Sequence, residues 1–131
     1  ASAEIIRKAS PHSVSETADR LTAAVEGAGA SVVARIDHAA AAAGVDADLR
    51  PTTLLVFGNP KLGTPVMQAD QAAGLDLPMR VVIFEGADGV VTVAYHDPAE
   101  LAANHAVPAD LESLGMMTGA LDKLTGAAIA P

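Results

Sequence analysis

The fold is decided by residues 81–95, which read Val81-Val82-Ile83-Phe84-Glu85-Gly86-Ala87-Asp88-Gly89-Val90-Val91-Thr92-Val93-Ala94-Tyr95. Two runs of β-branched and apolar residues flank a short segment in which glycine can supply the positive φ that tight turns need. The pattern predicts a β-hairpin of strands 81–85 and 90–95. Because hairpin strands are antiparallel, we expect the sheet that contains them to be mainly antiparallel.

Three further segments, 3–9, 31–37 and 52–57, have the composition or the alternation of strands. In 31–37, strict alternation places Val32, Ala34 and Ile36 on one face of the strand. The strands 54–57 and 81–84 are apolar on both faces, which is typical of strands that are covered on both sides.

Two long helices are expected. The first begins at a capping box, Ser13 to Glu16, and ends at Gly27 and Gly29. The second carries an apolar stripe at helical spacing, made of Leu111, Leu114, Met117, Leu121 and Leu124.

Shorter helical segments are expected at three places. A small-residue tract, 39–43, predicts one helical turn. Thr64 and Pro65 fit the cap and the first position of a short helix that ends before Gly74. Asp97 and the residues after it repeat this pattern and predict a helix to about residue 104.

The order is therefore strand, helix, four strands and helix, in a single domain that spans residues 1–131. It predicts an α+β two-layer sandwich, with a mainly antiparallel sheet and both long helices on one face. Two helices cover only one side of the apolar central strands. We therefore expect a homodimer, in which a second copy covers the other face of the sheet.

Composition narrows the possible functions. The 131 residues carry a net charge of −8 and only 2% are aromatic, so nucleic-acid binding is not expected. Cysteine is absent, which excludes disulfides and thiolate chemistry. The first nine residues lack the apolar core of a signal peptide, and no apolar run is long enough to span a bilayer. We expect a cytoplasmic protein that does not enter the membrane.

The segment from Phe57 to Met67, FGNPKLGTPVM, is the best candidate for a site, because it follows a strand and is rich in glycine and proline. Lys61 and the amides of Gly63 and Thr64, at a helix start, could hold a carboxylate or phosphate. The alternative is a purely structural turn, in which Asn59 bonds locally and Pro60 stiffens the chain.

Histidine chemistry stays open. The four histidines form no His-Glu-x-x-His motif, and no catalytic residue can be named. His38 follows a predicted strand, where it either ties the strand end to a loop or contacts a ligand. Convergence of His38 and Asp37 with His96 and Asp97 would provide a metal site, although no metal ligand is assigned.

The chain resembles the domain-of-unknown-function family 302. The matching pieces are Asp37-His38, Phe57-Gly58-Asn59-Pro60, Gly63-Thr64-Pro65 with Met67, Leu75-Asp76-Leu77-Pro78, and Tyr95-His96-Asp97-Pro98. They occur in the family's order between about residues 3 and 107. The resemblance implies an α+β fold similar in topology to the TATA-binding-protein class, and it brings no catalytic or binding residues. His96 departs from the asparagine that the family often has there.

These observations predict a small soluble binding module that holds a small, possibly anionic ligand near residues 57–67. The cofactor is unknown. The predicted ligand-binding residues are His38, Asn59, Lys61, Gly63, Thr64, Tyr95 and His96. The alternatives are a small enzyme that depends on a metal or on a histidine, and a structural domain that forms a dimer through its sheet.

Overall fold

The computed structural model of the chain describes residues 5–131. It contains a five-stranded antiparallel sheet, with two long helices on one of its faces. The strand order is β1-β5-β4-β3-β2. The strands are β1 (Ile5–Ser10), β2 (Ser31–Asp37), β3 (Thr52–Gly58), β4 (Met79–Glu85) and β5 (Val91–His96). Residues 3 and 4 of the predicted first strand lie outside the described residues.

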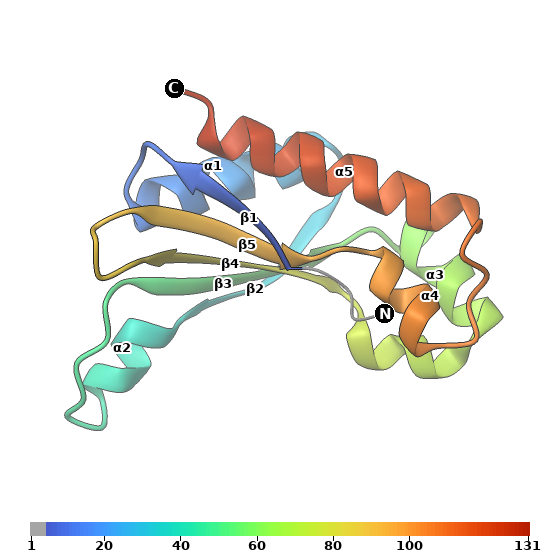
Figure 1. Cartoon of the computed structure of the whole chain (residues 1–131), viewed down its shortest axis with the longest axis horizontal. Coiled ribbons are helices and arrows are strands. Elements are labelled where there is room, and N and C mark those ends of the chain that lie inside the picture. The colour runs from blue at the N-terminus through green and yellow to red at the C-terminus, as the bar shows by residue number, and fades with distance from the viewer. Residues whose placement is uncertain (1–4) are drawn as a thin grey trace.

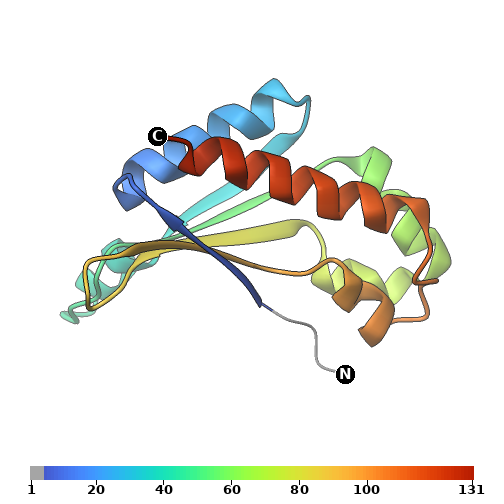
Figure 2. The same ribbon diagram turned by 45° about the horizontal axis from the view of Figure 1, so that its top comes forward.

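The long helices α1 (Val14–Gly27) and α5 (Glu112–Ile129) lie side by side above the sheet (Figure 1, Figure 2). The shorter helices are α2 (His38–Ala43), α3 (Pro60–Ala69), the 3₁₀ helix η1 (Gln71–Asp76) and α4 (Ala99–Asn104). The predicted α+β two-layer sandwich is confirmed. None of the described helices has the length and apolar character needed to cross a membrane.

The hairpin of β4 and β5 has the turn that its sequence predicts. Gly86 N donates to Val90 O over 2.9 Å, and Gly89 adopts a φ of 81° that favours glycine. The Asp88 carboxylate accepts from Val90 N over 3.0 Å, which fixes the turn further.

The strict alternation of faces predicted for residues 31–37 is wrong, because β2 contains a β-bulge at Val33. Val32 pairs with Phe57, but Ala34 pairs with Val56, so one residue is skipped. As a result Val32 and Arg35 face the helices, and Ala34 turns to the opposite face with Ile36. The Arg35 guanidinium confirms this orientation by donating to Asp19 of α1 over 2.7 Å.

Two hydrophobic clusters hold the layers together. The main cluster lies between the sheet and the helices α1 and α5, and its largest fully buried side chains include Phe57, Leu21, Leu55 and Ile83. The second cluster lies among the short helices and the first half of α5; its buried members are Val66, Ala73, Leu101, Val107, Leu114 and Met117. The long helix α5 therefore belongs to both clusters.

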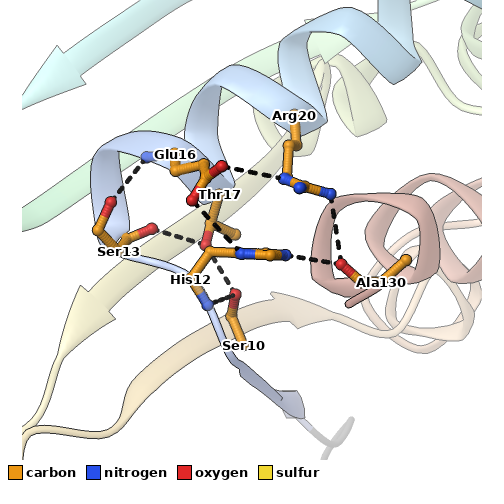
Figure 3. Close-up of polar contacts among 7 residues, drawn as sticks. All are labelled: Ser10, His12, Ser13, Glu16, Thr17, Arg20 and Ala130. Carbon is orange, nitrogen blue, oxygen red and sulfur yellow. Dashed lines mark hydrogen bonds and ion pairs between the residues drawn. The ribbon is translucent and has the colours of Figure 1, made fainter.

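The C-terminal end of α5 is tied to the start of α1 by a polar clasp (Figure 3). His12 Nε2 lies 2.6 Å from Ala130 O, and Arg20 donates to the same carbonyl over 3.3 Å. Ser13 caps α1 by accepting from Glu16 N, as the capping box predicts. The Glu16 carboxylate pairs with His12 and Arg20.

The face of the sheet opposite α1 and α5 is called here the open face. Its residues are those that alternate with the buried ones, among them Ala34, Ile36, Leu54, Val56, Val82, Phe84 and Ala94. Ile36 is 40% exposed. The apolar second face that the sequence predicts is therefore present, and α1 and α5 both lie on the other side (Figure 2).

Candidate functional site

One end of the sheet gathers the segments from which α3 and α4 emerge. Strand pairing brings Gly58 at the end of β3 beside Ser31 at the start of β2, and Phe57 beside Met79 at the start of β4. β5 ends at His96 on the same side, while α2 extends from the opposite end of the sheet (Figure 1). This end therefore holds most of the predicted site residues.

The helix α3 begins five residues earlier than the sequence predicts. Asn59, rather than Thr64, is the cap, since its side chain accepts from Lys61 N over 3.0 Å. Pro60 occupies the first helical position and Pro65 lies inside the helix. Asn59-Pro60 and Thr64-Pro65 both fit the cap pattern, and the earlier pair starts the helix.

This shift removes the anion site expected at residues 61–64. Gly63 N donates to Asn59 O over 3.1 Å within the helix, so this amide has a partner already. Lys61 and Thr64 are exposed residues of α3 rather than of a loop. The predicted cradle of free amides at Gly63 and Thr64 is wrong, because these residues continue a helix instead of opening one.

A groove of about 350 Å³ nevertheless lies against the segment, and we call it the α3 groove. Its polar rim contains Ser31, Asn59 and Thr64, and Gly63 forms part of its wall. Apolar side chains make up most of the lining: Val33, Leu62, Met67, Leu77, Met79 and Met117. Among the described residues, no charged side chain lines the α3 groove, and Lys61 lies outside its lining.

A second, smaller cavity of about 90 Å³ shares three wall residues, Leu77, Met79 and Met117, with the α3 groove. Its polar side contains His96 and Glu100, whose atoms Nδ1 and Oε2 lie 2.8 Å apart. His96 therefore lines this cavity and not the α3 groove.

Tyr95 lines neither the α3 groove nor the small cavity. It is 5% exposed and packs in the main cluster, with the Lys8 ammonium 5.8 Å from the ring centroid. Because Tyr95 and His96 are adjacent on a strand, their side chains point to opposite faces.

His38 lies at the far end of the sheet, so its predicted place beside residues 57–67 is wrong. It follows Asp37, which pairs with Thr53, near the start of β3, whereas Asn59 follows the end of that strand. Asp37 caps α2 by accepting from Ala40 N over 2.9 Å. The convergence of His38 with His96 is excluded by the same register. Within residues 5–131 no group of three or more metal-binding side chains is assembled.

One polar cluster has no counterpart in the sequence interpretation. His105 Nε2 lies 2.6 Å from Asp76 Oδ2, and Ala106 N donates to Asp70 Oδ2 over 2.9 Å. Hydrogen bonds from the amides of Ala106 and Ala72, followed by the charge of His105, lower the pKa of the Asp70 carboxyl. The cluster joins η1 to the segment after α4, and only its tertiary contacts reveal it.

Comparisons with known proteins agree with this fold. The family described as "Domain of unknown function DUF302" matches residues 6–125. A crystal structure of an uncharacterized conserved protein DUF302 from Bacillus stearothermophilus superposes with a TM-score of 0.74 and 17% identity. The match covers 95% of this chain and 94% of that one, and it shows the fold alone.

Two curated relatives are longer proteins. The fluoride-specific ion channel FluC 1 of Brucella suis is 41% identical over 112 residues, which are 84% of this chain and 44% of the relative. FluC 1 of Brucella abortus is also 41% identical over 112 residues, covering 84% of this chain and 42% of the relative. The chain thus spans less than half the length of these relatives.

Proposed function

The chain belongs to the DUF302 family, and we propose that within this fold it is a small binding module whose ligand occupies the α3 groove. The observation that carries the proposal is the groove itself, formed by the glycine- and proline-rich segment that stands out in the sequence. Its volume of about 350 Å³ lies within the range of small-molecule sites, and its apolar wall with few polar groups is typical of them.

The lining argues for a neutral or mainly apolar ligand. Ser31, Asn59 and Thr64 can orient a hydroxyl or carbonyl group at the rim. An anionic ligand in this groove has less support, because Lys61 lies outside the lining. Met67, Met79 and Met117 can adapt the wall to ligands of different shape.

Titration with indole, a neutral aromatic probe, tests the groove by amide NMR shifts. We expect the shifts to cluster at residues 58–67 and 77–79. Gly63→Leu should weaken indole binding at least about tenfold, because its side chain would fill the groove beside Met67 and Leu77. Gly119→Leu is the matched control: the position is also a helical glycine, with no neighbour within 4 Å of an added Cβ. Equal binding by both variants would contradict the proposal.

A second candidate is acid–base chemistry at His96. The contact of 2.8 Å between His96 Nδ1 and Glu100 Oε2 favours it, since a carboxylate can orient an imidazole whose other nitrogen acts on a substrate. A reaction found by screening should then be lost in His96→Gln and reduced in Glu100→Gln. Full activity in His96→Gln would exclude this candidate.

We also propose that two copies pair through the open face, on the side of β2 and β3. Ala34, Ile36 and Val56 supply an apolar surface there. Light scattering coupled to gel filtration should give about twice the chain mass of 13.1 kDa. Ile36→Asp should produce monomers, and a monomeric parent protein at micromolar concentration would contradict the proposal.

A further inference from the structure

The β1 side of the open face contains a hollow of about 350 Å³, separate from the α3 groove. Its lining includes Arg7 of β1, Arg80, Val82 and Phe84 of β4, and Ala94 and His96 of β5. We call it the arginine hollow. Most of these lining residues belong to the open face, and α1 and α5 lie on the other side of the sheet (Figure 2).

Ala94 explains why the sheet is hollowed there. Strand pairing places it between Arg7 and Val82, so a methyl group stands between two longer side chains. Ala94 is only 4% exposed, although both long helices lie on the other face. Its neighbours on the open face therefore stand above it and form walls around an apolar floor.

Two exposed arginines, Arg7 and Arg80, are among the residues that line this hollow. Within residues 5–131 neither Arg7 nor Arg80 forms an ion pair, and the strand residues on this face include no aspartate or glutamate. His96 lies at the edge of the hollow with Glu100 beside its Nδ1. Two guanidinium groups on an apolar surface of a protein with net charge −8 are complementary to an anion that has an apolar part.

We propose that the arginine hollow is a second binding site, specific for a small amphipathic carboxylate. The carboxylate would lie between Arg7 and Arg80, and its hydrocarbon part would cover Val82, Phe84 and Ala94. A second copy of the chain suits this part of the face less well, because a symmetric pair would bring arginines of like charge together. A bound carboxylate would instead neutralise the charge of these arginines.

Hexanoate is a suitable probe, tested on the whole chain by amide NMR titration. Hexanoate shifts should cluster on β1, β4 and β5 and saturate. Hexanamide, which lacks the charge, and acetate, which lacks the hydrocarbon part, should each bind at least about tenfold more weakly, since charged hydrogen bonds and apolar burial each contribute at this scale. Phosphate and fluoride, which also lack a hydrocarbon part, should bind as weakly as acetate.

Arg80→Gln and Arg7→Gln should each weaken hexanoate binding about tenfold or more. Lys123→Gln removes one positive charge from an exposed position on α5 and should leave the affinity unchanged. Ala94→Val keeps both arginines, suits a strand, and should block the hollow by filling its floor. Indole binding in the α3 groove should survive all these substitutions, so the two proposals fail separately.

Three results would overturn the proposal. The first is hexanoate affinity that is unchanged in both arginine variants. The second is binding of acetate, phosphate or fluoride as strong as that of hexanoate, which would remove the need for a hydrocarbon part. The third is a stable dimer that buries β1 and β5 and shows no hexanoate shifts there, because a second copy would then be the occupant.

Discussion

The two halves of α5 lie in different surroundings, and the difference separates stability from binding. The C-terminal half packs Leu121 and Leu124 into the main cluster, against α1 and the sheet. The N-terminal half packs Leu114 and Met117 among the short helices, and Met117 borders both the α3 groove and the small cavity. The half with the smaller core thus carries the space for a ligand. Binding regions are commonly drawn from the less stable parts of a fold.

The polar contacts at the two ends of this helix also differ. At the C-terminal end His12 meets a backbone carbonyl that Arg20 also binds. Near the N-terminal end His105 meets the carboxylate of Asp76, with Asp70 3.9 Å from its other nitrogen. The first arrangement can lose one donor and keep the other, whereas the second depends on one histidine.

Truncating one leucine in each half gives the largest expected effect. Leu121→Ala and Leu114→Ala should each lower the free energy of unfolding by about 2–5 kcal/mol, with Leu121→Ala near the upper limit. Truncation of Leu114 should cost less because Leu114 lies in the smaller of the two hydrophobic clusters. Urea denaturation measures both, and Met116→Ala, at an exposed position of the same helix, should change stability by less than about 0.5 kcal/mol. Equal losses for the two leucines would mean that the clusters behave as one core.

Replacing each histidine tests the polar contacts. His105→Asn should cost about 1–3 kcal/mol, because it removes the partner of Asp76 in a site where the histidine side chain is 10% exposed. His12→Asn should cost about 1 kcal/mol or less, because Arg20 still binds Ala130 O. Thermal unfolding gives the comparison, and hydrogen exchange should show that His105→Asn loosens η1 and α4. A larger loss of stability in His12→Asn than in His105→Asn would contradict this expectation.

The smallest expected effect is on the loss of folding stability at acidic pH. The pKa of Asp70 is lowered in the folded state, first by the amide of Ala106. The folded form therefore binds fewer protons, so the stabilisation is present above the unfolded-state pKa and is lost as the pH falls through the folded-state value. Urea denaturation between pH 3 and 6 should show a shallower acid loss in Asp70→Asn than in the parent protein. Asp48→Asn, on an exposed loop, controls for the change of charge, and identical slopes in all three proteins would refute this role.

Local patterns predicted the fold, because each element is coded by neighbouring residues. The hairpin needed only the turn at residues 86–89, and the stripe of α5 needed only its own spacing. The predicted start of α3 is wrong because Asn59-Pro60 and Thr64-Pro65 carry the same local signal. The bulge at Val33 has no signature in a strand of ordinary composition.

The site was harder to predict, since it depends on strand order and register. Those decide that His38 and Asn59 lie at opposite ends of β3, and no local pattern reports them. The contact of His105 with Asp76 joins residues 29 positions apart, so no local pattern predicts it either. The segment 57–67 forms one wall of a groove, and its glycines and prolines mark the place where a strand becomes a helix.

The bulge at Val33 also bears on how the protein behaves at high concentration. β2 is an edge strand, and the unpaired amides and carbonyls of a straight edge can recruit strands of other molecules. The skipped residue bends this edge and interrupts its hydrogen-bonding ladder. At the opposite edge, β1 carries the charges of Arg7 and Lys8. Both margins of the sheet therefore resist edge-to-edge growth, and we expect the protein to stay free of fibrils even though half of its residues are apolar.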